Sequence, residues 1–231
     1  MEFIEFKNLS KNFGPKEALK NINLTIEKGK IYGLLGPNGS GKTTMIKIIN
    51  DLLQPTSGEI LINGREPGIE SKKIISFLPE RTYLNMNMKV SELIQFFKDF
   101  YEDFDEKKAL QLLHKLKIKE TDQLKNMSKG TKEKVQLVMV MSRKADLYIL
   151  DEPIGGVDPA SRDYILETIL TNFNEGSSIL ISTHLISDIE KILDQVIFIN
   201  QGKIVLNEDA DTIRKKKKTT IDKLFREEFK C

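Results

Sequence analysis

The stretch LLGPNGSGKTTMIKIIN, residues 34–50, places three glycines, a lysine and two threonines between an apolar run and a helix-like run. Glycine adopts backbone angles that other residues resist, so such a loop can turn several consecutive N–H groups into one concavity. A concavity of this kind binds anions, and so does the N-terminus of the helix that follows it. The pattern is G-x-x-x-x-G-K-[ST], which holds the phosphates of a nucleoside triphosphate.

The flanking residues favour this interpretation over an ordinary glycine-rich turn. GKIYGLLG, residues 29–36, predicts a buried strand, and TTMIKIINDLL, residues 43–53, spaces its apolar residues as a helix does. The hydroxyl of Thr43 is also suited to bind Mg²⁺. We therefore expect the following loop residues to bind nucleotide: Gly36, Pro37, Asn38, Gly39, Ser40, Gly41, Lys42, Thr43 and Thr44.

Composition limits the class of protein. The chain has 231 residues, a net charge of +2 and 39% hydrophobic residues, which suits one globular domain and indicates no nucleic-acid partner. No uncharged apolar stretch is long enough to cross a bilayer, and acids are mixed into the N-terminal apolar residues, unlike in a signal peptide. The single cysteine, Cys231, cannot form an internal disulfide, so we expect a cytoplasmic location.

Alternating and continuous apolar runs predict strands along most of the chain. Residues 2–9, 18–26 and 58–64 indicate a small antiparallel sheet, and residues 72–80 indicate a further apolar strand. Residues 145–153 and 176–184 have the continuous apolar character of central parallel strands. Residues 195–206 carry a Gln-Gly turn between two apolar runs, which predicts a hairpin.

The character changes to helical spacing between about residues 86 and 144. The segments 90–101 and 107–118 each place apolar residues on one helical face, so we expect an inserted helical lobe. His114 lies there without a second histidine nearby, and we expect it to be structural or exposed rather than a metal ligand. The core then comprises about residues 1–85 and 145–213 of a single domain, 1–231.

A basic and amphipathic tail occupies residues 214–231. RKKKK, residues 214–218, is expected to be a solvated helix end, with contact to anionic lipid headgroups as the alternative. The apolar residues Ile221, Leu224, Phe225 and Phe229 then recur at helical spacing.

Two acids end the apolar strand LYILDEP, residues 147–153. In phosphate-loop enzymes a strand-end aspartate helps to hold Mg²⁺, which is the role expected for Asp151. The adjacent Glu152 is then placed to polarise an attacking water as a general base. Taken alone, the pair would also suit a helix N-cap, but the phosphate loop upstream makes that alternative weaker.

Six motifs follow one another along the chain: GPNGSGKTT (36–44), SFLPE (76–80), MSKGTKEKVQL (127–137), LYILDEP (147–153), GGVDPASR (155–162) and ILISTH (179–184). In this order they resemble the Walker A, Q-loop, signature, Walker B, D-loop and H-loop motifs of ABC transporter ATP-binding subunits. The resemblance covers nearly the whole chain. It implies an α/β fold: a P-loop NTPase RecA-like core with an N-terminal antiparallel β subdomain and an inserted helical subdomain.

The resemblance also assigns roles. Phe13 matches the aromatic residue that stacks on adenine, although a phenylalanine of the core is an alternative at this position. Lys42 is expected to contact the β- and γ-phosphates, and Glu152 to be the base. His184 is expected to hydrogen-bond the γ-phosphate, and Asp158 of the D-loop counts among the catalytic residues.

The signature implies a second chain. Ser128 is predicted to cap the helix that follows, and Ser128 with the amide of Gly130 would form a second anion site. In the family that site closes over the γ-phosphate held by a partner subunit, so two ATP molecules lie between two chains arranged head to tail. The implied partners are a second ATP-binding subunit, identical or similar, and an integral membrane permease.

Two residues depart from the family pattern. Lys129 replaces the first signature glycine, and Glu80 replaces the Q-loop glutamine. Glu80 would offer Mg²⁺ a charged oxygen in place of a neutral one, so it is expected to be both a metal ligand and a catalytic residue. Both variants resemble a branch with separate permease subunits, often export or drug-resistance systems.

The resemblance therefore implies a Mg²⁺-dependent ATPase that powers transport through a separate permease, with the chain on the inner face of the membrane. The alternative is a soluble ABC-type ATPase without a transport role, for example in iron–sulfur cluster assembly. A phosphate-loop kinase is less suitable because the signature and D-loop have no role there.

Overall fold

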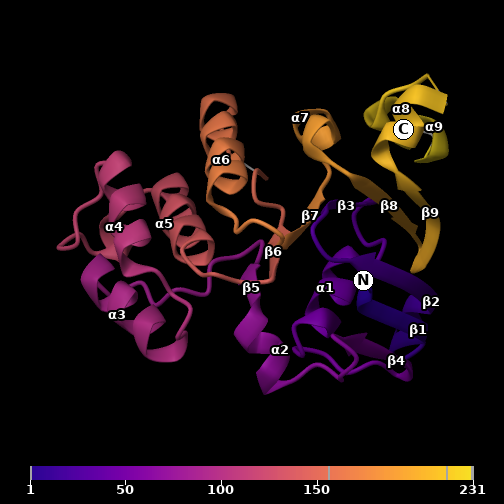
Figure 1. Ribbon diagram of the computed structural model, residues 1–231, viewed down its shortest axis with the longest axis horizontal. Helices are drawn as coiled ribbons and strands as arrows, with labels where there is room; N and C mark the ends of the chain where they lie inside the picture. Colours follow the sequence, from indigo (N-terminus) through magenta and orange to yellow (C-terminus); the bar gives the residue numbers. More distant parts are fainter. Residues whose placement is uncertain (1, 156, 217, 230–231) are drawn as a thin grey trace.

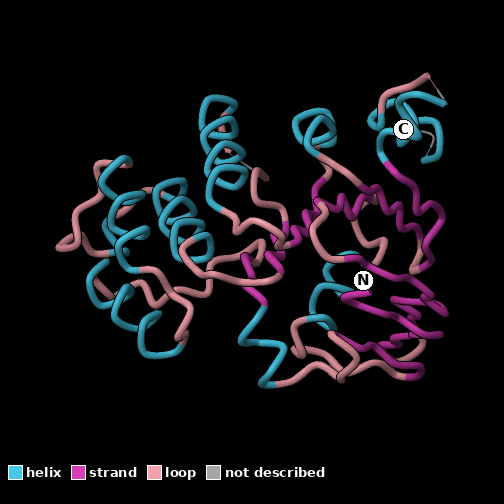
Figure 2. The backbone as a smooth tube through the Cα atoms, in the orientation of Figure 1, coloured by secondary structure: helices cyan, strands magenta, loops and turns pink. Residues whose placement is uncertain are grey.

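The computed structural model describes residues 2–155, 157–216 and 218–229, and it contains two sheets and a helical lobe. Figure 1 shows the lobe on one side, the N-terminal sheet on the other and the C-terminal helices near the end of the second sheet. Strands, helices and loops are distinguished in Figure 2. Within the described residues, no helix combines the length and the apolar character needed to cross a membrane.

The N-terminal sheet is antiparallel, as the alternating apolar pattern predicts. It consists of β1 (Glu2–Phe13), β2 (Lys16–Glu27) and β4 (Ser57–Ile62), in the order β2-β1-β4. Its inward side chains, including Phe3, Ile4 and Ile26, pack in one core with Met45 and Ile49 of helix α1 (Lys42–Ile49). The sheet therefore supports the helix that begins at the phosphate loop.

The second sheet runs through the centre of the molecule. It contains β3 (Ile31–Leu35), β5 (Ile75–Leu78), β6 (Leu147–Asp151), β7 (Ser178–Thr183), β8 (Gln195–Asn200) and β9 (Lys203–Asp209), in the order β5-β6-β7-β3-β8-β9. The first five are parallel, and β9 returns antiparallel to β8 through the predicted Gln201-Gly202 turn. Because β3, β7 and β6 are neighbours, the residues that follow their carboxyl ends meet at one edge of the sheet.

The helical lobe contains α3 (Val90–Phe100), α4 (Glu106–Lys115), a short 3-10 helix (Leu124–Asn126) and α5 (Lys129–Met141). Val90, Leu93, Phe97 and Leu113 pack with Val135 of α5 in a core of their own. The other side of α5 packs in the main core through Leu137, Val140 and Met141. The lobe and the central sheet thus share α5. His114 is exposed in the last turn of α4, which is one of the two roles expected for it.

Two predicted elements are shorter than expected. The helix after the phosphate loop ends at Ile49 instead of residue 53, because Asp51 adopts a left-handed φ of 53°. Leu52 is 57% exposed, so its apolar character does not indicate helix burial. The strand expected over residues 72–80 spans only Ile75–Leu78, since residues up to Ile74 form α2 (Ile69–Ile74).

The remaining helices cover the central sheet and its C-terminal end. They are α6 (Pro159–Asn172), α7 (Ile186–Ile189), a 3-10 helix (Glu190–Ile192), α8 (Ala210–Lys216) and α9 (Ile221–Phe229). The rings of Phe225 and Phe229 lie 5.4 and 5.8 Å from the ring of Phe198 in β8. The C-terminal segment therefore packs on the core instead of extending away from it.

In the basic run at the start of this segment, Lys215 and Lys218 are exposed, as expected for a solvated helix end, whereas Arg214 is partly buried. Arg214 is 33% exposed, pairs with Asp211 and donates hydrogen bonds to the carbonyls of Glu190 and Leu193. Lys215 is exposed and also pairs with Asp211. Lys217 and Cys231 lie outside the described residues.

Candidate nucleotide-binding site

The phosphate loop joins β3 to α1, and close packing requires glycine at two of its positions. A Cβ atom on Gly36 would lie 2.2 Å from the carbonyl oxygen of Ile199, a contact that no side chain tolerates. Gly41 has a φ of 116°, and a Cβ atom there would lie 2.8 Å from the carbonyl oxygen of Ala18. The loop therefore packs closely between β8 and β2, and this packing fixes the position of its backbone.

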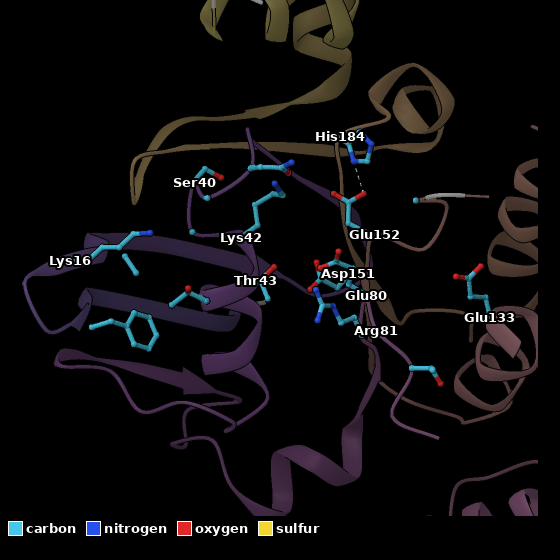
Figure 3. Close-up of a pocket in the computed structure, with 18 of the residues that line it drawn as sticks. Lys16, Ser40, Lys42, Thr43, Glu80, Arg81, Glu133, Asp151, Glu152 and His184 are labelled. Atoms are coloured by element: carbon cyan, nitrogen blue, oxygen red, sulfur yellow. Dashed lines mark hydrogen bonds and ion pairs between the residues drawn. The ribbon is translucent and has the colours of Figure 1, made fainter. Parts of the chain in front are cut away.

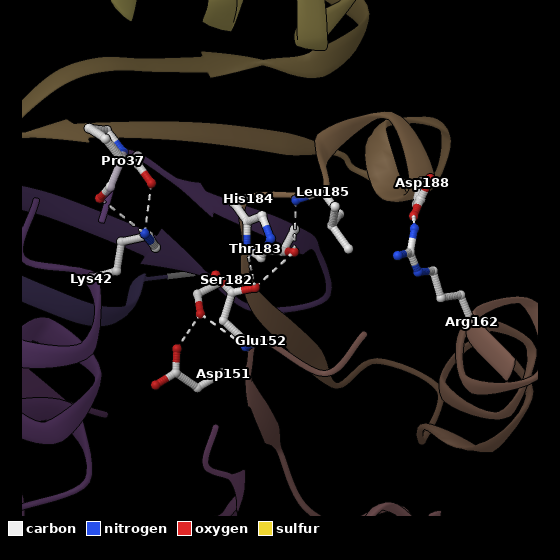
Figure 4. A network of polar contacts seen from close by, with 11 residues as sticks. Pro37, Lys42, Asp151, Glu152, Arg162, Ser182, Thr183, His184, Leu185 and Asp188 are labelled. Atoms are coloured by element: carbon white, nitrogen blue, oxygen red, sulfur yellow. Dashed lines mark hydrogen bonds and ion pairs between the residues drawn. The ribbon is translucent and has the colours of Figure 1, made fainter. Parts of the chain in front are cut away.

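Lys42 is the first residue of α1, and its side chain turns back under the loop. The residue is 7% exposed, and its Nζ donates to the carbonyl oxygens of Gly36 at 2.7 Å and Pro37 at 3.3 Å (Figure 4). Burial lowers the pKa of Lys42 below its usual value, and the nearby negative charges of Glu152, Asp151 and Glu80 offset only part of this decrease. A cation held in this way is close to the acids and available to an anion.

A hollow of about 1060 Å³ opens over the loop (Figure 3). Lys16 lies at one end of the view, and Lys42, Thr43, Asp151, Glu152, Glu80 and His184 gather in its centre. Most of the expected site residues line it: Phe13, Asn38, Gly39, Ser40, Gly41, Lys42, Thr43, Thr44, Glu80, Asp151, Glu152 and His184. The hollow is large enough for a nucleotide, since ligand pockets typically span about 300–1,000 Å³.

Phe13 ends β1 at this hollow and is 47% exposed. The alternative of a core phenylalanine is therefore wrong. The Nζ of Lys11 lies 5.3 Å from the centre of its ring, and Lys16 and Ala18 of β2 line the hollow beside it. An exposed ring of this kind offers a flat apolar face to a planar base.

Asp151 ends β6 and is 3% exposed. Burial raises the pKa of Asp151, the charges of Glu80 and Glu152 add to the increase, and hydrogen bonds from Ser182 and Thr43 oppose it. The Ser182 contact runs from the hydroxyl to Oδ1 of Asp151. A buried carboxylate beside a threonine hydroxyl and a second carboxylate provides the hard oxygen ligands that Mg²⁺ prefers.

The oxygen set suits Mg²⁺ only together with a nucleotide. Among the described residues, no group of three or more histidine, cysteine, aspartate or glutamate side chains is arranged to hold a metal ion by itself. Mg²⁺ is usually bound by one or two carboxylates together with substrate phosphates and water. Thr43, Asp151 and Glu80 fit that pattern.

Glu152 adopts a left-handed backbone, with a φ of 52°, in the turn after β6. Its amide donates to the carbonyl of Ser182 at 2.9 Å. Its Oε2 accepts hydrogen bonds from Thr183 Oγ1 at 3.2 Å and from His184 Nδ1 at 2.9 Å (Figure 4). A strained non-glycine residue costs about 1–3 kcal/mol and is typical of functional positions. Since the acids belong to a strand end and its turn, the helix N-cap alternative is wrong.

His184 follows β7, and its side chain is 56% exposed. Its Nδ1 contacts Glu152, so Nε2 is the ring nitrogen that remains for a phosphate oxygen. Its expected contact with the γ-phosphate is consistent with this geometry and stays a prediction.

Sequence reasoning gave no role to two residues that position the acids. Ser182 and Thr183 lie within the H-loop motif, and the β6–β7 register pairs Asp151 with Ser182. Their contacts follow from two strands lying side by side, which a linear motif does not reveal. Unlike these two, the following residues line the hollow without having had an expected role: Lys16, Ala18, Arg81, Thr82, Lys132, Glu133 and Gly155.

The signature lies on α5, and its predicted cap is confirmed: the Thr131 amide donates to Ser128 Oγ at 3.2 Å. Ser128 and Gly130 do not line the hollow of their own chain, although Lys129 does. Asp158 is exposed before α6 and is likewise outside the lining. The roles expected for Ser128, Gly130 and Asp158 stay predictions that require a second chain.

Comparison with known proteins shows that this chain has many relatives. A family model described as ABC transporter matches residues 19–155. The chain is 34% identical over 210 residues to the lantibiotic transport ATP-binding protein SrtF of Streptococcus pyogenes, covering 90% of this chain and 91% of that protein. It is 33% identical over 211 residues to the SkfA peptide export ATP-binding protein SkfE of Bacillus subtilis, covering 89% and 88%.

A solved structure described as the ATP-binding subunit of an ABC transporter superposes with a TM-score of 0.87 at 28% identity, covering 97% of this chain and 98% of the other. The P-loop NTPase fold is thereby confirmed.

Proposed function

The chain belongs to the ABC transporter family as an ATP-binding subunit, and from this premise we propose a Mg²⁺-dependent ATPase that works in a head-to-tail pair. ATP binding and hydrolysis by this subunit drive transport. One observation carries the proposed chemistry: the Glu152 carboxylate is fixed by Thr183 and His184 in the hollow that also contains Lys42 and Asp151.

The site residues divide the chemistry among them. Lys42 and the loop amides bind the phosphates, and Thr43, Asp151 and Glu80 would hold Mg²⁺, which supplies charge neutralisation when bound. Glu152 accepts a proton from water as the water oxygen bonds to the γ-phosphorus and the bond to the bridging oxygen of ADP breaks. His184 would hydrogen-bond the γ-phosphate.

The head-to-tail pair is supported by the absence of Ser128 and Gly130 from the lining of the hollow. Ser128 and Gly130 present a capped helix N-terminus that does not line the chain's own nucleotide site. In a two-fold pair, the N-terminus of α5 of each chain can face the nucleotide of the other chain. Both of these helix ends then have an anion to bind. ATP then stabilises the pair, and loss of the γ-phosphate contacts on hydrolysis lets it open.

Mixing two inactive variants tests this arrangement. Ser128→Arg should abolish ATP-driven pairing and turnover without weakening ATP binding, because the arginine occupies the space intended for the partner's phosphate. Mixed with Lys42→Ala, it should recover ATPase activity up to about one half of the parent's, since ATP drives only mixed pairs together and each mixed pair has one intact site out of two. Steady-state ATPase rates of the mixture and of each variant alone provide the measurement. Absence of recovery in demonstrated mixed pairs would contradict independent head-to-tail sites.

A second hollow, of about 700 Å³, is suited to the permease. It lies between α1, β5 and the lobe, and its wall includes Phe77, Tyr83, Phe97 and Tyr101. Lys47, Lys72 and Arg81 add positive charge to the lining. We infer that an apolar cytoplasmic segment of the permease carrying an acidic residue docks there. The chain would then lie at the cytoplasmic face of the membrane.

Glu80 and Arg81 line both hollows, together with Thr43 and Asp151. The segment after β5 can therefore respond to the nucleotide on one side and to the permease on the other. Coupling between two sites requires such an element, whose contacts differ between two states.

Substitution of Glu80 tests this link. Glu80→Gln should keep the ATPase rate within about tenfold of the parent's, because a neutral oxygen can still bind Mg²⁺. Glu80→Ala should lower the rate further, with the larger loss in permease-stimulated turnover. ATPase rates are compared with and without the permease in lipid, and Glu59→Gln, an exposed change in β4, serves as control. Parental behaviour of Glu80→Ala in both settings would show that Glu80 is only a solvated strand-end acid.

The name of one relative supports a proposal on the direction of transport. SrtF is a lantibiotic transport protein and SkfE a peptide export protein by their names, and both are covered over most of their length. We propose export of a peptide or a similar amphiphilic compound.

A further inference from the structure

Arg143 is a buried charge that the nucleotide chemistry does not use. It follows α5, is 2% exposed and lies where the helical lobe meets the central sheet. Buried guanidinium groups require several acceptors, because removing a charge from water is costly. The acceptors of Arg143 come from separate parts of the chain.

On the core side, Arg143 binds the carbonyls at the junction of α2 and β5. Its Nη1 donates to Ile75 O at 2.5 Å, and its Nη2 donates to Lys73 O at 2.6 Å. These acceptors include orphan carbonyls at the C-terminus of α2, which favour a cation. Arg143 therefore holds the start of the strand that leads to Glu80.

On the lobe side, the same guanidinium contacts the loop between α3 and α4. Its Nε donates to Asp103 Oδ1 at 3.0 Å, and its central carbon lies 3.9 Å from the centre of the Tyr101 ring. The other oxygen of Asp103, Oδ2, is buried with no hydrogen-bond partner within the described part of the chain. Asp103 thus relies on Arg143 for compensation of its charge.

We propose that Arg143 is the positioning residue that sets the angle of α5, and with it the place of the signature, relative to β5. This inference rests on the proposed head-to-tail pairing. Arg143 and Ser128 lie at opposite ends of α5, which at 1.5 Å per residue are about 22 Å apart. A tilt of about 10° at the Arg143 end moves the other end by about 3–4 Å, whereas catalytic geometry tolerates about 1 Å.

Lysine cannot replace arginine here. A guanidinium carries five donors in a planar fork and stacks on aromatic rings, whereas an ammonium is a compact point charge. Arg143→Lys therefore keeps the charge and loses the simultaneous contacts with Asp103, Ile75 and Lys73. Arg214 provides a matched control, because it also binds two carbonyls and an aspartate, Asp211, but at the far end of the sheet.

The first measurement is the distance between the lobe and the core. Spin labels are placed at Gln111→Cys on α4 and Lys203→Cys on β9, both exposed, in a Cys231→Ser background. Arg143→Lys should broaden or shift the distance distribution by about 3–4 Å, as expected from the tilt. Arg214→Lys should keep the parental distribution. An unchanged distribution in Arg143→Lys would overturn the proposal.

The second measurement is ATP-driven pairing in a Glu152→Gln background. Arg143→Lys should raise the ATP concentration for half-maximal pairing about tenfold, while ATP affinity of the single chain stays within about twofold, because the phosphate loop is untouched. Equal loss in both quantities would indicate general unfolding and would overturn a positioning role.

Two further outcomes are distinguishable. If Glu152→Gln alone does not pair with ATP, the proposed function fails, and the spin-label distances still decide the role of Arg143. If Arg143→Lys does not fold, Asp103→Asn replaces it in both measurements, because the amide keeps an oxygen for Nε and removes the compensating charge. Parental distances and pairing in Asp103→Asn would then overturn the proposal.

Discussion

Glu152→Gln is expected to lower kcat by at least about 100-fold and to leave ATP affinity within about twofold of the parent's. The amide oxygen of glutamine can still accept the hydrogen bonds that Thr183 and His184 donate to Glu152, so the local geometry is retained. The side chain can no longer accept a proton from water, and general-base catalysis typically contributes about 10²–10⁴-fold. The phosphate loop, which determines binding, is unchanged.

Steady-state turnover and calorimetric ATP binding measure the two quantities, and size-exclusion chromatography with ATP detects the paired form that should accumulate. Glu175→Gln is the control, since Glu175 is exposed before β7, at the end opposite to His184. A normal rate in Glu152→Gln would show that another group is the base.

Lys42→Ala is expected to weaken ATP binding by at least about tenfold and to lower kcat/KM by at least about 100-fold. The lysine contacts phosphate in the ground state as well as in the transition state, so binding and chemistry are lost together. Its removal also leaves the carbonyls of Gly36 and Pro37 without their donor, which loosens the loop.

Lys42→Arg is the matched variant. It keeps the charge, but the larger guanidinium must fit a position that is 7% exposed, so it should not restore affinity. Calorimetry measures ATP affinity for both variants. Parental affinity in Lys42→Ala would contradict nucleotide binding at this loop.

Local features of the site can be predicted from the sequence because each depends on consecutive residues. The phosphate loop, the two acids at and just after the end of β6 and the serine cap of α5 are each encoded within a few positions, and the structure has all three. The alternating and continuous apolar runs likewise predicted both kinds of sheet, because burial on one face or on two faces follows from the side chains themselves.

The residues at which helices and strands end could not be predicted in the same way, because they depend on single backbone angles and on packing. Asp51 ends α1 in a left-handed conformation although Leu52 and Leu53 continue the apolar pattern. A periodic pattern does not show which apolar residue finds a partner, and Leu52 finds little burial. In the C-terminal helix, by contrast, the apolar residues do find a partner, because Phe198 of a distant strand covers that face.

The sequence by itself thus determined the family, the phosphate loop and the identity of the acids, because each is written in contiguous residues. Only the tertiary structure decided which groups hold those acids in place. Ser182 reaches Asp151, Thr183 and His184 reach Glu152, and Arg143 joins the lobe to β5 through partners about 40 and 70 positions away. These contacts depend on strand order and register, which arise from burial of the whole chain at once and not from any single segment.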